Sequence, residues 1–265
     1  NAISDVYAMG GTPIMALALV GMPVNVLPPE TIGKILDGGQ SVCREAGIPI
    51  AGGHTIDSVE PIYGLVALGL VHPKRIKRNA DARVGDRLIL GKPLGVGVLS
   101  AALKKNALSP EGYAQMIANT TQLNTPGAAL SALSGVHAMT DVTGFGLAGH
   151  ALEMARGSHT TVQLTMANVP LLQGVRELAA QGCLTGASGR NWAAYGHEVQ
   201  ISDACQAIDQ ALLTDPQTSG GLLVACAPES VDEVLAVFHQ HGFAAASEVG
   251  DIVAPHGNGI HLHVH

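Results

Sequence analysis

Aromatic and charged side chains are scarce in this chain of 265 residues. Phe, Trp and Tyr together make up 3% of the sequence and Asp, Glu, Lys and Arg 13%, whereas apolar residues make up 47%. A sizeable core can therefore be buried, and it must be built from Ala, Val, Leu and Ile rather than from rings. The length suits one large domain or two modest ones.

Cysteine is also sparse, and its four copies are scattered along the chain. No two of them form a Cys-x-x-Cys pair, so neither a zinc knuckle nor a redox dithiol is indicated. Scattered cysteines are typical of reduced thiols, and we therefore expect a cytoplasmic protein. The four are Cys43, Cys183, Cys205 and Cys226.

Long apolar runs and basic clusters are missing as well. The longest apolar run, residues 14–22, is too short to span a bilayer, and no charged-then-apolar signal peptide is present. The formal net charge is −7, and the basic run at 72–78 is expected to be a solvated connector rather than a nucleic-acid patch. We therefore expect neither a membrane nor a nucleic-acid partner. An acidic protein that handles a polyanion such as ATP needs metal ions between the two.

Glycine, proline and apolar runs divide the sequence into short elements. Before residue 72, helices are predicted over 1–10 and 28–46, and strands over 12–20, 48–51 and 61–71. The basic connector at 72–83 is the best candidate for a domain boundary. Beyond it, strands are predicted at 87–90, 160–165, 221–226, 244–253 and 259–264, two helices within 98–133, and further helices at 146–156, 173–181 and 229–241. This mixture predicts an α/β (α+β) fold with two lobes, residues 1–80 and 85–265.

The first chemically suggestive segment is the predicted helix at 1–10. Asn1 and Asp5 lie one helical turn apart, so an amide oxygen and a carboxylate face the same side. Such a pair can hold a hard cation. The alternative is an ordinary polar helix face with Asp5 in solvent.

The second segment is Gly52-Gly53-His54 at the end of a predicted strand. Glycines at such a turn let the backbone approach a phosphate, and free N–H groups can cradle it. The segment is not a Walker A loop, because the Lys-Ser/Thr pair is missing. The alternative is a turn that is capped by a hydrogen-bonded histidine.

The third segment runs from Met139 to His150. Asp141 ends a short predicted strand, and a glycine-bracketed turn then leads into a helix. Bare N–H groups at a helix start attract anions, and the adjacent carboxylate can hold their Mg²⁺. Asp and Thr are also common helix caps, which is the alternative.

Motifs for covalent catalysis are absent from the sequence, which has neither Gly-x-Ser-x-Gly nor His-Glu-x-x-His. The alternating histidines at 261, 263 and 265 lie on one face of a predicted strand and can either bind a metal or belong to a frayed terminus. We assign no catalytic residue.

Taken together, these segments resemble selenophosphate synthetase over essentially the whole chain. The looser pattern of the loops is shared with aminoimidazole-ribotide synthetase and its relatives, whereas the third and last segments point to the selenium branch. The segments that carry the resemblance are NAISDVYAMGG (1–11), AGGHTID (51–57), MTDVTGFGLAGH (139–150), RNWAAYG (190–196) and DPQTSGGLL (215–223).

The resemblance implies an activity in which selenide, ATP and water give selenophosphate, AMP and orthophosphate. It implies Mg²⁺ and a monovalent cation such as K⁺. It also implies a two-lobed, aminoimidazole-ribotide synthetase-like fold and a homodimer, in which the N-terminal lobes pair their sheets into a shared β-barrel and ATP lies in a cleft of each subunit.

Individual residues follow from the same resemblance. Asp5 and Asp141 match the family's Mg²⁺-binding aspartates. Gly53, His54 and Thr55 match its ATP-contacting turn, and Asn1, Thr143 and Gly144 sit beside these positions.

The family's glycine-rich N-terminal segment has no counterpart upstream of Asn1 in this sequence. That segment carries the Cys or selenocysteine thought to handle selenide, the essential Lys and further Mg²⁺-binding aspartates. We therefore expect the chain alone to make no selenophosphate. Two alternatives remain: another ATP-dependent synthetase of the aminoimidazole-ribotide type, or a non-catalytic nucleotide-binding paralogue.

Overall fold

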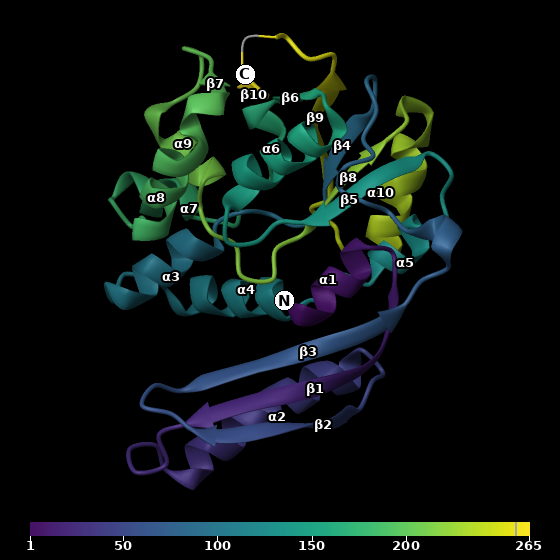
Figure 1. Ribbon diagram of the computed structural model, residues 1–265. Helices are drawn as coiled ribbons and strands as arrows, with labels where there is room; N and C mark the ends of the chain where they lie inside the picture. The colour runs from purple at the N-terminus through teal and green to yellow at the C-terminus, as the bar shows by residue number, and fades with distance from the viewer. Residues whose placement is uncertain (258) are drawn as a thin grey trace.

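The computed structural model describes residues 1–257 and 259–265, which form two lobes joined by one connector (Figure 1). The smaller lobe comprises the first part of the chain. Its elements are α1 (Ala2–Ala8), β1 (Thr12–Met22), α2 (Pro29–Glu45), β2 (Ile50–Asp57) and β3 (Ile62–Leu70).

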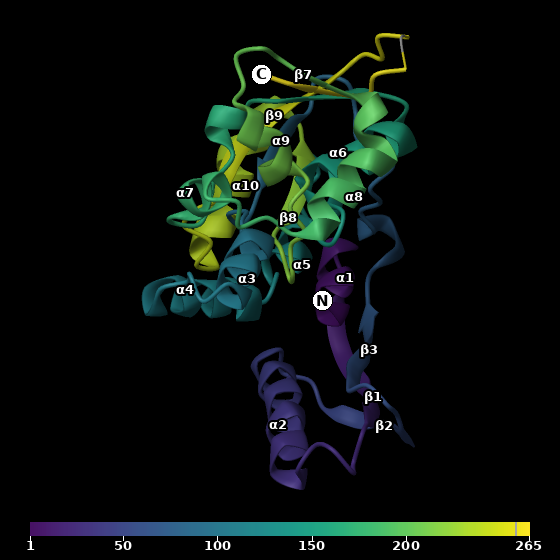
Figure 2. The same ribbon diagram turned by 90° about the vertical axis from the view of Figure 1, so that its left-hand side faces the viewer.

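The three strands of the small lobe form a mixed sheet in the order β2-β1-β3. β1 is parallel to β2 and antiparallel to β3. Helix α2 covers one face of this sheet (Figure 2), where Ala16, Cys43 and Ile48 form part of a small core. The opposite face is open to solvent, and Leu17 and Val66 there are 39% and 60% exposed. A single chain therefore forms an open sheet rather than a closed barrel.

Strand β2 corrects a prediction. The Gly52-Gly53 pair was expected to end the strand at residue 51, but β2 continues through both glycines to Asp57. Gly53 lies directly against β1, because a Cβ built there would come 1.9 Å from the carbonyl oxygen of Ala18. The glycine is therefore required by strand packing, and the phosphate-cradling turn predicted at residues 52–54 is wrong.

The connector at 72–86 contains the short 3₁₀ helix η1 (Pro73–Arg75). Lys77 fastens it to the larger lobe by donating hydrogen bonds to the carbonyl oxygens of Leu133 and Val136.

The larger lobe is built on a seven-stranded sheet in the order β5-β8-β4-β9-β6-β10-β7. Its strands are β4 (Arg87–Leu90), β5 (Val136–Asp141), β6 (Thr161–Leu164), β7 (Val199–Ile201), β8 (Leu222–Cys226), β9 (Ser247–Val253) and β10 (Leu262–Val264). Its helices are α3 (Val96–Lys104), α4 (Pro110–Thr121), α5 (Pro126–Leu130), α6 (Gly146–Ser158), α7 (Val175–Ala180), α8 (Gly186–Tyr195), α9 (Ala207–Leu213) and α10 (Val231–Gln240). Short 3₁₀ turns, η2 (Met166–Asn168), η3 (Gly196–Glu198) and η4 (Pro228–Ser230), complete the lobe.

Both faces of the large sheet are covered by helices. Successive strand residues point to opposite faces, and the alternation in β4 shows this, since Leu88 and Leu90 face one core whereas Ile89 faces the other. The larger core includes α6, and the smaller one includes Phe238 of α10. Helix α1 packs below β5 and α5, so the small lobe meets the large one at the end of β5 (Figures 1 and 2).

The structure has three helices, α3, α4 and α5, where two were predicted within 98–133, and it also contains α8, α9 and β7, which were not predicted from the sequence. None of the helices in the part of the chain that the structure describes is both long and apolar enough to cross a membrane.

Candidate functional site between the lobes

Asp141 is the buried centre of the region where the lobes meet. It ends β5, is 7% exposed, and its Oδ2 accepts a hydrogen bond of 2.7 Å from the Ser4 hydroxyl. Ser4 in turn accepts one of 2.8 Å from the Asn124 side-chain amide, which also donates to the carbonyl of Gly220. Asn124, Ser4 and Asp141 thus form a chain of hydrogen bonds across the lobe interface, and it fixes one carboxylate oxygen of Asp141.

Asp5 lies on the exposed side of α1, close enough to Asp141 to feel its charge. Partial burial raises the pKa of Asp5 above its usual value, and the negative charge of Asp141 raises it further. Two carboxylates that repel each other in this way are stabilised by a cation placed between them. The structure therefore places the two aspartates that the sequence predicted as metal ligands on packed elements, α1 and β5.

Asn1 joins the same region from the start of α1. Its side-chain oxygen accepts a hydrogen bond of 2.8 Å from the backbone N–H of Ser219. Ser219 belongs to the loop before β8, which is the DPQTSGGLL segment. The Asn1 side chain does not cap α1, so its contact is with the other lobe rather than with its own helix.

Lys92 is a buried cation that sequence reasoning missed. It is 2% exposed, and its Nζ donates to the carbonyl oxygens of Asn119, Gln122 and Ser219 at 3.0, 2.6 and 2.8 Å. Burial lowers the pKa of Lys92 to about 8, and the charge of Asp141 opposes this shift. A lysine directly after an apolar strand was the one available signal of this residue.

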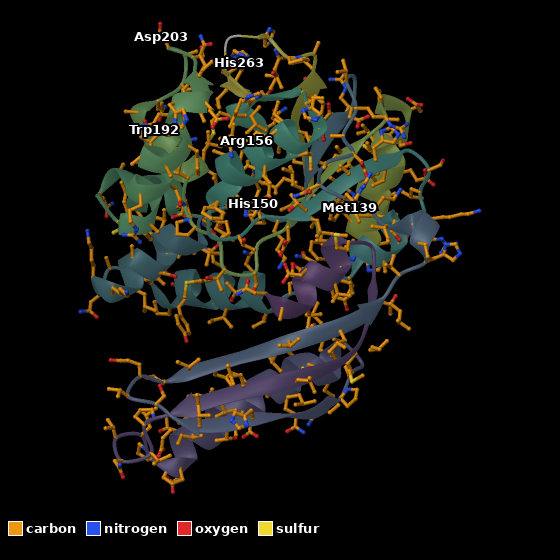
Figure 3. The ribbon with its side chains drawn as sticks, viewed as in Figure 1. Met139, His150, Arg156, Trp192, Asp203 and His263 are labelled. Atoms are coloured by element: carbon orange, nitrogen blue, oxygen red, sulfur yellow. The ribbon has the colours of Figure 1, made fainter. Side chains whose placement is uncertain are left out.

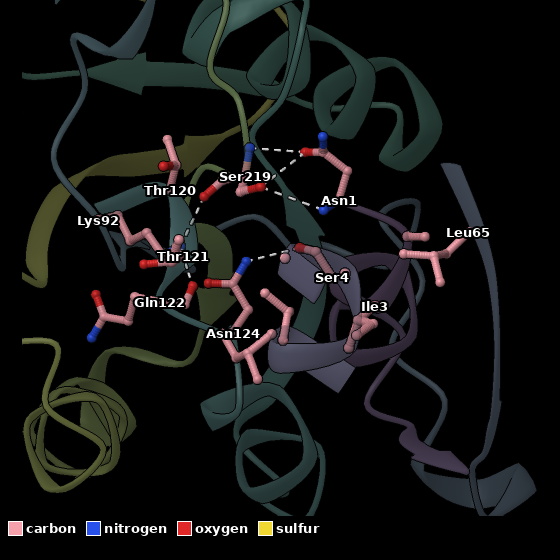
Figure 4. A pocket seen from close by; sticks show the side chains of 15 residues that line it. Asn1, Ile3, Ser4, Leu65, Lys92, Thr120, Thr121, Gln122, Asn124 and Ser219 are labelled. Atoms are coloured by element: carbon pink, nitrogen blue, oxygen red, sulfur yellow. Dashed lines mark hydrogen bonds between the residues drawn. The ribbon is translucent and has the colours of Figure 1, made fainter. Parts of the chain in front are cut away.

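These side chains border a cavity of about 250 Å³ between α1, α2 and the end of α4. Figure 4 shows Ser219 between Asn1 and Lys92 at this cavity, with Ser4 and Asn124 beside them. The cavity is also lined by Thr120, Thr121 and Gln122 at the end of α4, and by the apolar side chains of Val42 and Leu65 of the small lobe. Polar groups from both lobes therefore line the cavity together with apolar groups of the small lobe, as is common in small-molecule sites.

The loop after Asp141 carries two further predicted residues, Thr143 and Gly144. The backbone N–H of Thr143 donates 3.0 Å to Nε2 of His150, which lies on α6 (Figure 3). Phe145 is the N-cap of α6, and no side chain caps that helix. The alternative reading of Asp141 and Thr143 as helix caps is therefore wrong.

Gly53, His54 and Thr55 lie elsewhere. They sit in β2, where they pair with Ala18, Leu19 and Val20 of β1, and they are exposed. Asp5 instead borders β3, at the other edge of the sheet. Within one chain the structure does not bring these three residues to the two aspartates, and the expected histidine-capped turn is not formed either.

The four cysteines remain unpaired, and three of them are buried. Burial raises the pKa of Cys226 to about 12, and it also raises the pKa of Cys43. A reactive thiolate needs the opposite environment, so these two thiols are poor nucleophiles.

Comparison with known proteins first defines the class. Residues 1–71 match the model of the AIR synthase related protein N-terminal domain, and residues 83–263 match that of the AIR synthase related protein C-terminal domain. Among solved structures, thiamine-monophosphate kinase from Stenotrophomonas maltophilia superposes with a TM-score of 0.74 at 18% identity, covering 99% of this chain and 75% of that one. The hydrogenase maturation protein HypE of E. coli gives 0.74 at 19%, covering 99% and 73%. The fold is thus that of the AIR synthase-related proteins.

Curated relatives with high sequence identity identify the family within this class. The selenide, water dikinase of Burkholderia pseudomallei is 69% identical over 96% of this chain and 72% of its own length. That of Pseudomonas straminea is 63% identical over 96% and 71%, and that of Rhizobium meliloti 57% over 96% and 73%. The chain belongs to the selenide, water dikinase family.

Proposed function

We propose that the region between the lobes binds Mg²⁺ and ATP for the synthesis of selenophosphate from selenide, with release of AMP and orthophosphate. The family supplies the reaction. The observation that supports this location is the environment of the Asp141 carboxylate. It is buried at the junction of the lobes, accepts a hydrogen bond from Ser4 through one oxygen, and raises the pKa of Asp5 through its charge.

The two aspartates fit Mg²⁺. Mg²⁺ is usually held by one or two carboxylates together with substrate phosphates and waters. In the described ranges 1–257 and 259–265 no group of three or more His, Cys, Asp or Glu is arranged to hold a metal by itself, so the remaining ligands would come from outside this pair. When bound there, the metal would neutralise the charge of the triphosphate. A requirement for K⁺ is proposed on the resemblance alone.

Residues from both lobes would contact the nucleotide. Asn1 adjoins the polar wall of the cavity, and Thr143 and Gly144 follow Asp141 on the loop into α6. The small lobe, residues 1–80, thus supplies Asp5, and the large lobe, residues 85–265, supplies Asp141. A phosphoryl-transfer site needs such positioning and charge neutralisation more than it needs a covalent nucleophile.

A homodimer would account for Gly53, His54 and Thr55. These residues are exposed on β2, the edge strand away from Asp5, so they can reach the nucleotide only from a second copy of the chain. The open apolar face of the small sheet, with Leu17 and Val66, is the surface that two copies would pair into a barrel. Unpaired thiols are compatible with the cytoplasm as the place of action.

Replacing each aspartate tests the proposed metal site. In the full-length enzyme, Asp5→Asn or Asp141→Asn should lower selenophosphate formation, followed by phosphorus NMR, at least about tenfold, or roughly 1.4 kcal/mol of transition-state stabilisation. Asp203→Asn is the control, since Asp203 is exposed at the far end of the large lobe (Figure 3). Turnover at the wild-type rate in both variants would remove this pair from the site.

A further inference from the structure

The segment RNWAAYG at 190–196 does not line the site described above, but its side chains contact the loop that follows Asp141. Helix α8 carries Ser188, Asn191 and Tyr195, which are spaced three and four residues apart and so lie on one helix face. All three are buried, at 4%, 8% and 7% exposure. This face points toward α9 and toward the loop at 142–146.

Two of these residues hold the backbone of the loop. The Asn191 side-chain amide donates 2.9 Å to the carbonyl of Gly144 and 3.0 Å to that of Thr214. The Tyr195 hydroxyl donates 2.5 Å to the carbonyl of Phe145. The preceding carbonyl, that of Thr143, accepts from the N–H groups of Gly146 and Gln217, each at 3.0 Å. Three successive carbonyl oxygens are therefore turned into the large lobe.

The direction of the carbonyls sets the direction of the amides. In a planar trans peptide the C=O and the following N–H point in opposite directions, and the described residues contain no cis peptide. The N–H groups of Gly144 and Phe145 must then point away from Gln217 and Asn191. Neither N–H has an acceptor in the described part of the chain.

The surroundings of the loop leave room on this outer side. A Cβ built on Gly144 would meet nothing within 4 Å, and the Phe145 side chain is 61% exposed. Asp141, the proposed Mg²⁺ ligand, lies three residues before Gly144. The N–H groups of Gly144 and Phe145 are held in a fixed direction near the Asp141 carboxylate. Such N–H groups can donate hydrogen bonds to the oxygens of a phosphate.

We propose that Asn191 and Tyr195 are positioning residues: they hold the loop at 143–146 so that the Phe145 amide, beside the Gly144 amide fixed by the hydrogen bond from Gln217 to Thr143, faces the phosphate chain of the nucleotide. The proposal rests on the proposed function, because it assumes that ATP binds beside Asp141. Asn191 acts on the peptide that carries the Phe145 N–H. Tyr195 acts on the next peptide, whose N–H belongs to Gly146 and closes the turn onto Thr143.

The direct readout is the Phe145 amide itself. The sequence contains three phenylalanines, so ¹⁵N-phenylalanine labelling gives a small set of backbone signals. The other two, Phe238 and Phe243, are buried in the core on the opposite face of the sheet and act as internal references. Adding the Mg²⁺ complex of a non-hydrolysable β,γ-imido analogue of ATP should shift the Phe145 signal and leave the references in place.

Affinity for the same analogue distinguishes positioning from folding. Asn191→Ala should weaken binding about tenfold, the scale of one hydrogen bond to a charged group, and Tyr195→Phe should weaken it less. Ser188→Ala is the matched control. Ser188 lies on the same face of α8 as Asn191 and Tyr195, but its hydroxyl makes hydrogen bonds to Ala211 and Thr214 rather than to the loop. It should lower Tm without changing affinity.

Two results would overturn the inference while leaving the proposed function intact: an analogue that binds without moving the Phe145 signal, or affinities of the three variants that fall only in proportion to Tm. Failure of the wild-type protein to bind the analogue at all would overturn both proposals.

Discussion

Ser4 is the residue through which the two lobes share one carboxylate. Ser4 lies on α1 of the small lobe. Its hydroxyl donates a hydrogen bond to Asp141 and accepts one from Asn124, and both of these residues belong to the large lobe. Because the hydroxyl occupies Oδ2 of Asp141, the other carboxylate oxygen is the one that the proposed Mg²⁺ would take. Groups that orient a ligand in this way typically change metal affinity 10–100-fold when they are lost.

We predict that Ser4→Ala lowers the affinity for Mn²⁺, used as a spectroscopic substitute for Mg²⁺, by about tenfold. Electron paramagnetic resonance of free Mn²⁺, titrated against the protein without ATP because ATP itself binds the ion, measures the effect. Ser41→Ala removes a hydroxyl that bonds only the carbonyl of Gly38 on α2, and it should leave the affinity unchanged. Equal affinities in both variants and in the wild type would show that the Ser4 hydroxyl does not orient the ligand.

The buried carboxyl group of Asp215 leads to a prediction of how the free energy of unfolding depends on pH. It is 1% exposed, and its Oδ2 accepts from the N–H groups of Gly97 and Val98 at the start of α3. Burial nevertheless raises the pKa of Asp215 from 3.8 to about 7, against the smaller opposing effects of Gln217 and the two amides. A pKa that is raised on folding means that the folded state binds the proton more tightly than the unfolded chain does.

The sign of the effect on stability follows from that linkage. The stabilisation from protonated Asp215 is complete below about pH 4 and is lost as the pH rises toward about 7. The free energy of unfolding of the wild type, measured relative to Asp215→Asn in urea, should therefore fall across this window. A difference between the two proteins that stays flat from pH 4 to 7 would mean that Asp215 is ionised throughout.

The sequence indicated the carboxylates of this region but not what holds them. Asp5 and Asp141 stand in recognisable segments, and the structure brings them near each other. Asn124 has no local signal of its own, and Lys92 has only its place after the apolar strand β4. Asn124 is 120 residues away from Ser4 along the chain, so a contact of this kind depends on the tertiary fold and cannot be read from spacing.

At the level of elements, the glycines of β2 play a role opposite to the one predicted. A glycine pair is a strong turn signal, but Gly53 has a φ of +156° and lies against the Ala18 carbonyl, so the absence of a side chain permits the pairing of β2 with β1. The local rule failed because the requirement comes from a neighbouring strand rather than from the local backbone.

Gly53→Ala should therefore destabilise the small lobe by about 2 kcal/mol or more, since the new Cβ overlaps a backbone atom that cannot move freely. Differential scanning calorimetry would show a lower Tm. Gly64→Ala is the matched change in β3, where a Cβ meets nothing within 4 Å, and its Tm should stay close to that of the wild type. A Tm unchanged by Gly53→Ala would mean that the two strands can separate at little cost.

Most other elements were predicted because they have clear local signals. Helix α2 begins after Pro28 with Pro29 in its first turn, and β4 is a short apolar run before Gly91. Helix α8 has weaker local signals: Thr185 caps its start, but its sequence contains two glycines and a weakly apolar face. It forms because Asn191 and Tyr195 bind other parts of the large lobe, which no local pattern reveals.

At the scale of the whole molecule, the two-lobed α/β fold was predicted and is confirmed. The association of two copies stays a prediction, and Val66 tests it. Val66→Asp places a charge on the open apolar face of the small sheet, so it should raise the dimer dissociation constant in sedimentation velocity at micromolar concentration.

Val84→Asp is the matched control, because Val84 is 59% exposed, as Val66 is at 60%, but lies outside the small sheet. It should sediment as the wild type does. A wild-type protein that is monomeric under these conditions, or a Val66→Asp variant that still dimerises normally, would contradict the barrel.

The strand order of the large sheet has a consequence for biosynthesis. β10 pairs with β6 on one side and β7 on the other, yet residues 262–264 leave the ribosome after both neighbours. While the chain is still being made, the edge of β6 stays unpaired and β7 has no strand to join. Exposed strand edges of this kind recruit other chains. A nascent chain that stalls before Leu262 is thus expected to depend on chaperones, and emergence of β10 is the step at which β6 and β7 gain their shared neighbour.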